Sequence, residues 1–182
     1  MKLPLLPPKA PRSPEEIGAL VDKLARMIVG RRLETPVTIF LESHRPLDAV
    51  IVMLGTNDLK HRFALSANDI AQGAGQLVDI VFQSKAGRDG IPPRVLLLAP
   101  PPVGRLLKFA DMFKSAEGKS NELGKYYKLI ADEKACLFLD TSAVIKSSNL
   151  DGIHLEKQEH AKLGKNIAEF VRNHHISFLP DI

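Results

Sequence analysis

Three continuous apolar runs recur along the second part of the chain. Short runs that are apolar along their whole length are typical of parallel strands covered on both faces. They are Ala49 to Leu54, Arg94 to Ala99 and Cys136 to Asp140. Each run therefore predicts one strand of a buried parallel sheet.

Each apolar run is followed by a stretch that places apolar residues at helical spacing. The three helices predicted in this way begin after the N-cap Ser66, cover about 121 to 131 and cover about 157 to 173. Parallel strands need crossovers of a dozen or more residues, and these helices provide them. The pattern predicts one three-layer α/β/α sandwich with a parallel sheet and right-handed crossovers.

The N-terminal part of the chain follows a different pattern. Its prolines predict a disordered or extended arm over residues 1–13. Ser13-Pro14-Glu15-Glu16 is typical of a helix start, and a helical stripe continues from there to Gly30. We therefore divide the chain into the arm, an atypical N-terminal helical segment over 14–47 and the α/β domain over 48–176.

The run from Thr35 to Leu41 permits two interpretations. It is rich in β-branched residues, which favour a strand. It is also short enough to be a buried turn of helix. The sequence pattern leaves this choice open.

Composition and charge exclude several classes of protein. The 182 residues carry 25 Lys and Arg against 21 Asp and Glu, a net charge of +4 too scattered for a nucleic-acid partner. The lone Cys136 excludes a disulfide framework and favours a reducing, cytoplasmic location. No apolar stretch approaches the roughly 20 residues of a membrane span, so we expect no membrane partner. The pair His174-His175 has no carboxylate or cysteine partner, so we predict no metal site.

Two polar segments lie near predicted strand ends, where reactive groups of parallel sheets collect. In Gly55-Thr56-Asn57-Asp58, glycine permits a sharp turn and the Asn57 amide can donate to an oxyanion, although an ordinary turn explains these residues equally well. In Asp151-Gly152-Ile153-His154, the carboxylate can hydrogen-bond the imidazole and stabilise its protonated form. Taken alone, this second pair fits solvated loop residues better.

Together and in this order, the two segments resemble blocks of the SGNH hydrolases, also called the GDSL esterase/lipase family. The matching motifs are MLGTND at 53–58 and DGIHL at 151–155, and the resemblance spans about Leu41 to Val171. Within the family, the chain is most similar to the bacterial branch of small aryl- and acetylesterases. The resemblance implies a flavodoxin-like sandwich that hydrolyses small aryl or acetyl esters through an acyl-enzyme, without cofactor or metal.

The resemblance also implies roles for individual residues. Asn57 would supply an oxyanion donor, with Gly55 supporting its turn. His154 would be the general base, and Asp151 would orient it. Because family relatives oligomerise and an uncovered sheet edge favours pairing, we also expect a homo-oligomer.

The chain departs from the family in its first two blocks. The GDS motif that holds the nucleophilic serine is absent from the sequence, so the fold is predicted to be N-terminally incomplete and the nucleophile is unknown. Ser43 is a tempting candidate because Ile39 to Ser43 superficially resembles a strand entering a GDS turn. Too few residues separate Ser43 from the next strand for a parallel crossover, which argues against this serine.

These features leave two classes of function open. The first is a hydrolase of small esters that uses an unidentified serine. The second is a catalytically impaired relative, either a binding module or a truncated or fused gene product. In a weaker third option, His154 activates water directly against a bound ester.

Overall fold

The computed structural model describes residues 34–174, which form seven regular helices and strands joined by short 3₁₀ turns. Predictions for residues 1–33 and 175–182 lie outside the described residues. The elements are α2 (Glu34–His44), β1 (Ala49–Val52), α3 (Ala67–Gln83), β2 (Arg94–Ala99), α4 (Ala116–Glu133), β3 (Leu137–Asp140) and α5 (Lys157–Asn173). None of the helices in this part of the chain is long and apolar enough to cross a membrane.

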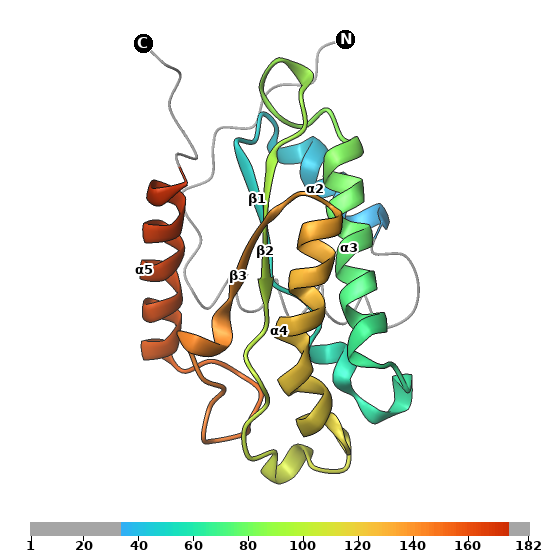
Figure 1. Cartoon of the computed structure of the whole chain (residues 1–182), viewed down its shortest axis with the longest axis vertical. Helices are drawn as coiled ribbons and strands as arrows, with labels where there is room; N and C mark the ends of the chain where they lie inside the picture. Colours follow the sequence, from blue (N-terminus) through green and yellow to red (C-terminus); the bar gives the residue numbers. More distant parts are fainter. Residues whose placement is uncertain (1–33, 175–182) are drawn as a thin grey trace.

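The three strands form a parallel sheet in the order β1-β2-β3. Leu97 in the central strand pairs with Val52 on one side and with Phe138 on the other. All three strands therefore end at the same edge of the sheet, which is the lower edge in Figure 1. The predicted parallel sheet is confirmed.

Helices cover both faces of the sheet, as the alternating side chains of β2 require. Val95, Leu97 and Ala99 belong to a core shared with α3 and α4, whereas Leu96 and Leu98 belong to a second core shared with α5. Figure 1 shows α5 on one side of the sheet and α3 with α4 on the other. The predicted three-layer sandwich is thus confirmed.

Ser66 caps α3 as expected, because its side chain accepts a hydrogen bond from the Asp69 backbone while the Asp69 carboxylate accepts one from the Ser66 backbone. The run from Thr35 to Leu41, which the pattern left open, is helical and lies within α2. Leu41 is buried in the same core as α3 and α4, so α2 packs as part of the sandwich.

Three elements have boundaries that differ from those predicted: β1, α4, and β3, which begins at Leu137 rather than at Cys136. Strand β1 ends at Val52 rather than at Leu54, ahead of the turn at Gly55. Helix α4 begins at Ala116, several residues before the predicted start near 121, because its first turn buries the small residues Ala116 and Ser120 instead of a large apolar stripe. Periodicity of large apolar residues could not reveal that turn.

The central strand sets the stability of the sandwich. Leu97→Ala should lower the free energy of unfolding by about 2–5 kcal/mol, because the side chain is fully buried and its removal leaves a cavity. Urea unfolding measures the change. The control Leu129→Ala, at a side chain that is 55% exposed on α4, should stay within about 0.5 kcal/mol of the parent. Similar losses in both variants would contradict this account of the core.

Candidate active site

Both polar segments singled out from the sequence lie at the carboxyl edge of the sheet. The turn η1 (Thr56–Leu59) follows β1 directly, and the loop before α5 follows β3 and a short 3₁₀ turn. Figure 1 shows η1 and this loop at the same lower end of the molecule. Parallel pairing brings them there, because every strand ends at that edge.

The first segment turns sharply at Gly55 and is held by Tyr127. Gly55 has φ +120°, and a Cβ at this position would collide with the Tyr127 hydroxyl, so the turn requires glycine. The Tyr127 hydroxyl donates a 2.5 Å hydrogen bond to the Leu54 carbonyl oxygen. Tyr127 is fully buried, and this burial raises the pKa of its phenol. The buried Tyr127 side chain therefore fixes the turn from its core side.

Asn57 stands in this turn with an exposed side chain. Its carbonyl accepts a 3.3 Å hydrogen bond from the Lys60 N–H, which fixes the backbone. Its side-chain amide has no hydrogen bond to any of residues 34–174 and remains available as a donor. The neighbouring Asp58 is half-buried, and desolvation raises the pKa of its carboxyl despite the nearby Lys60.

The second segment holds a hydrogen-bonded carboxylate and imidazole. His154 Nδ1 lies 2.6 Å from Asp151 Oδ2, while Oδ1 accepts hydrogen bonds from the backbone N–H groups of Ile153 and His154 at 2.9 and 3.0 Å. The Asp151 side chain is 16% exposed and the His154 side chain 62% exposed. Because Nδ1 is engaged, Nε2 is the nitrogen left to meet a ligand.

The geometry of this loop sets the protonation state of its carboxyl. Burial acts to raise the pKa of Asp151, but hydrogen bonds from the His154 ring and from two backbone N–H groups outweigh it and lower this pKa to about 2. Gly152 has φ +76°, and a Cβ there would meet the Arg105 backbone at 2.7 Å, so the loop needs glycine to pack against residue 105. Asp151 is therefore ionised and held in place near neutral pH.

An aromatic segment that the sequence analysis did not single out connects the two. The Phe109 ring lies 6.4 Å from the His154 ring and 6.4 Å from the Phe113 ring, in edge-to-face geometry. The His61 N–H, just after η1, donates to the Met112 carbonyl at 2.9 Å. The segment thus contacts both the His154 loop and the residues that follow Asn57. The spacing of Phe109 and Phe113 four residues apart was the available signal.

Ser43 lies away from these groups. It belongs to the last turn of α2, before the amino end of β1, and its hydroxyl donates to the Phe40 carbonyl at 3.2 Å. The amino ends of parallel strands form the edge opposite the carboxyl ends. The structure therefore does not bring Ser43 together with Asn57, Asp151 and His154.

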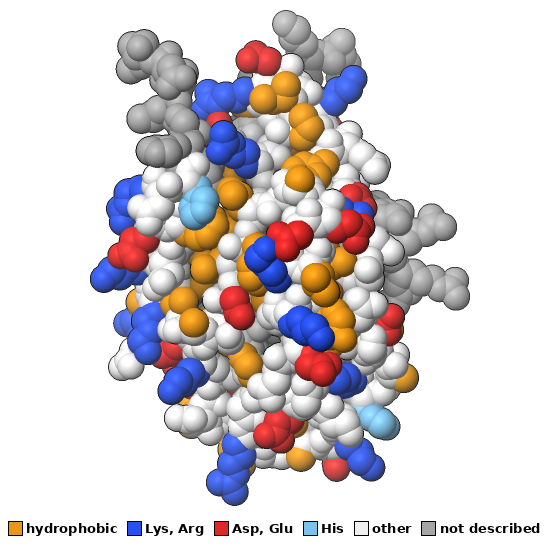
Figure 2. Space-filling view, viewed as in Figure 1, with side chains coloured by type: hydrophobic (Ala, Val, Ile, Leu, Met, Phe, Trp, Pro, Cys, Tyr) orange, Lys and Arg blue, Asp and Glu red, His pale blue; other side chains and the backbone are white. Residues whose placement is uncertain are grey.

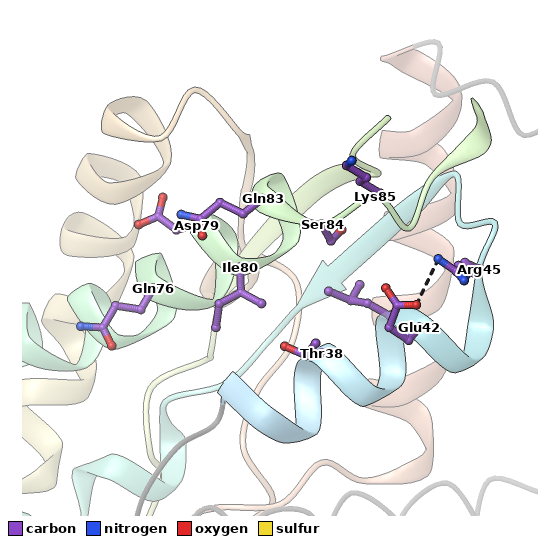
Figure 3. Close-up of a pocket in the computed structure, with 10 residues that line it drawn as sticks. Thr38, Glu42, Arg45, Gln76, Asp79, Ile80, Gln83, Ser84 and Lys85 are labelled. Atoms are coloured by element: carbon purple, nitrogen blue, oxygen red, sulfur yellow. Dashed lines mark ion pairs between the residues drawn. The ribbon is translucent and has the colours of Figure 1, made fainter. Parts of the chain in front are cut away.

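A groove of about 780 Å³ between α2 and α3 also lies away from these groups. Figure 3 shows its lining, including the Glu42–Arg45 ion pair, with Lys85 near the same end. A second cavity, of about 80 Å³, lies under the Gly55 turn against Tyr127. Residues 34–174 contain no group of three His, Cys, Asp or Glu side chains that could hold a metal ion.

The solved structures that this chain is similar to include several esterases. A carbohydrate acetylesterase from Sinorhizobium meliloti matches with a TM-score of 0.72 and 39% identity, over 77% of this chain and 67% of that chain. An aryl esterase from M. smegmatis matches with a TM-score of 0.72 and 36% identity, over the same shares. Another carbohydrate acetylesterase family member from S. meliloti matches at 0.70 and 29%, over 76% and 67%. No family model and no curated protein matches the sequence.

The hydrogen bond between Asp151 and His154 can be tested by measuring the pKa of the Asp151 carboxyl. His154→Ala should raise the pKa of Asp151 from about 2 toward its ordinary value, because the ring hydrogen bond is lost. Carbon-detected NMR titration of the side-chain carboxyls measures this shift. Asp69, whose pKa is lowered by Ser66, should titrate identically in both proteins. Since an ionised Asp151 stabilises the fold above its unfolded pKa, this contribution disappears as the pH falls from about 4 to 2. An unaltered Asp151 titration in the variant would show that the ring does not act on it.

The role of Tyr127 in holding the turn is tested by removing one hydroxyl. Tyr127→Phe should lower the free energy of unfolding by about 1–3 kcal/mol, because the Leu54 carbonyl loses its side-chain donor. It should also shift the NMR signals of the Asn57 side-chain amide. Tyr126→Phe, whose hydroxyl has no hydrogen-bond partner among residues 34–174, is the matched control and should change neither quantity. Unchanged Asn57 signals in Tyr127→Phe would contradict the role of Tyr127 in fixing this turn.

Proposed function

Because this chain belongs to the SGNH hydrolase, or GDSL esterase/lipase, family in its branch of aryl- and acetylesterases, we propose that it acts on small carboxylic esters. The observation that carries the proposal is the hydrogen bond between Asp151 and His154 at the carboxyl edge of the sheet. A histidine held by a carboxylate, at the same sheet edge as an amide donor, is the arrangement that ester hydrolysis uses.

In this proposal His154 is the general base. The Asp151 carboxylate accepts a hydrogen bond from the Nδ1–H group, so the unprotonated Nε2 is free to take a proton from an attacking hydroxyl and later return it to the leaving alcohol. Ionised Asp151 stabilises the imidazolium that forms between these two steps. The low pKa of Asp151, about 2, keeps this carboxylate ionised near neutral pH.

Asn57 is the proposed oxyanion donor. Its exposed amide has no hydrogen-bond partner among residues 34–174, and the Gly55 turn that carries it is anchored to buried Tyr127. A donor that is positioned before the reaction stabilises the developing oxyanion without a reorganisation cost. Phe109, beside the His154 ring, provides an apolar wall for a small aryl or acyl group.

Among residues 34–174, no side chain is identified as the nucleophile. No serine hydroxyl in this range is hydrogen-bonded to His154, and GDS does not occur in the sequence. This observation favours the second candidate function, a catalytically impaired binding module. The two candidates make different predictions about turnover.

The missing serine leads us to expect slow hydrolysis. With the base and one oxyanion donor present, turnover of 4-nitrophenyl acetate should exceed the uncatalysed rate by no more than about 10³–10⁴-fold, as in serine hydrolases that have lost their triad. His154→Ala should abolish it, and Ser43→Ala should leave it unchanged, because Ser43 lies at the opposite edge of the sheet. Initial rates for the parent and both variants measure this.

A fluorophosphonate probe with peptide mapping separates the candidates further. We expect no adduct. Fast turnover that disappears in Ser43→Ala, with an adduct on Ser43, would overturn the expectation. An adduct on Ser115, which has φ +65° just before α4, would identify that serine as the nucleophile instead. No turnover above the His154→Ala background would favour the binding module.

We also propose a cytoplasmic location and a homo-oligomer. Cys136 is the sole cysteine and is half-buried, as expected for a chain that needs no disulfide. Among the described residues, β1 pairs with β2 alone, so the other edge of β1 offers a surface for pairing with a second chain. Ile51 in β1 is 47% exposed. Mass measurement in solution tests the oligomer.

A further inference from the structure

The aromatic segment beside His154 carries a lysine on each of its rings. Lys108 Nζ lies 5.2 Å from the centre of the Phe109 ring, and Lys60 Nζ lies 5.8 Å from the centre of the Phe113 ring. Phe109 is the ring that contacts His154. The Lys108 ammonium group is therefore one aromatic ring away from the proposed general base, and the Lys60 ammonium group is two rings away.

Neither lysine forms an ion pair with another of residues 34–174, although the Asp58 carboxyl lies close enough to act on Lys60. The segments 60–63 and 104–115 hold five basic side chains and one acidic side chain, and none of the six forms an ion pair within the part of the chain that the structure describes. Figure 2 shows Lys and Arg side chains beside hydrophobic ones at this lower end of the molecule, with Asp and Glu side chains among them. Partial burial, with Arg62 nearby, lowers the pKa of Lys60 and outweighs the opposite effect of Asp58.

We infer that the substrate is an aromatic ester whose ring carries a negatively charged group, such as a carboxylate. This inference rests on the proposed function and names the substrate class of the same site. The ring would pack against Phe109, the ester would face His154, and the anion would reach Lys108 and Lys60. Arg105, whose backbone packs against Gly152 of the His154 loop, adds a further positive charge to this segment.

Electrostatics favours this class over neutral esters. Neither ammonium group is in an ion pair, so both gain a close counter-ion when an anion binds, and the partly buried Lys60 is screened by less water than an exposed lysine. An excess of positive charge beside a site also steers anionic ligands toward it. A neutral aromatic ester would use the Phe109 wall but leave both cations without a partner.

A lysine over an aromatic ring is also common where no ligand binds, and the chain contains such a pair. Lys125 Nζ lies 5.2 Å from the centre of the Tyr126 ring on α4, the same distance as in the Lys108–Phe109 pair. Lys125 lies in the middle of α4, whereas Lys108 lies in the segment before that helix. The Lys125–Tyr126 pair is therefore a matched internal control.

The test measures binding without requiring turnover. The full chain is titrated with 4-hydroxybenzoate and with neutral 4-hydroxybenzamide, and NMR follows the His154 and Phe109 ring signals. We expect 4-hydroxybenzoate to bind about tenfold more tightly than the amide, and this preference to shrink in 0.5 M NaCl. Lys108→Gln combined with Lys60→Gln should remove the preference, whereas Lys125→Gln should retain it.

Several outcomes would overturn the inference. Equal affinity for the acid and the amide would mean that the lysines do not select a charge. Equal loss in Lys125→Gln would mean that the effect comes from net charge alone. No shift of the ring signals by either compound at millimolar concentration would mean that the aromatic segment is not a ligand site.

A kinetic comparison keeps this inference separate from the proposed function. Hydrolysis of 4-acetoxybenzoate adds water across the ester and releases acetate and 4-hydroxybenzoate. Selective binding of 4-hydroxybenzoate without any turnover of 4-acetoxybenzoate would reject the esterase and retain the anion site. Turnover of 4-acetoxybenzoate and 4-acetoxybenzamide at equal kcat/KM, without selective binding, would retain the esterase and reject the anion site.

Discussion

Strand β2 is buried on both faces, and the rest of the structure depends on this constraint. Its side chains alternate between the core with α3 and α4 and the core with α5, so helices are needed on both sides. Its two neighbours pair with it in parallel, and each connection must therefore return across the sheet through a helix. As a consequence, the turn after β1 and the loop before α5 open on one edge, although almost a hundred residues separate Asn57 from His154.

The core also reaches into the site through one side chain. Tyr127 comes from the middle of α4, is fully buried, and ends with its hydroxyl on the Leu54 carbonyl just ahead of Gly55. Glycine leaves the space that this hydroxyl occupies, so the conformation of the turn and the packing of α4 depend on each other. The position of Asn57 is therefore a property of the whole helix–sheet interface, and a change in the packing of α4 would move the proposed oxyanion donor.

The sequence predicted the parts of the molecule that depend on local pattern. The buried run from Arg94 to Ala99 and the apolar stripe of α5 were predicted at their observed bounds. In both elements the buried positions hold mainly large apolar residues, which makes the pattern visible in the sequence. The first turn of α4 was missed because it buries small side chains, which leave no hydrophobic period. The contact of Phe109 with His154 was missed because it joins residues far apart in sequence, and only the folded sheet edge brings them together.

The difference between local and long-range contacts also separates the proposed base from the nucleophile. The Asp151–His154 pair is built within one loop, from residues three apart, and its geometry is fixed by two backbone N–H groups of the same loop. Such a pair keeps its geometry as long as the loop folds, regardless of which residues other elements place at the carboxyl edge of the sheet. A nucleophilic hydroxyl must instead be delivered to Nε2 by another element of the sheet. The presence of the pair therefore supports membership of the hydrolase family strongly, whereas turnover depends on a group that the loop itself does not position.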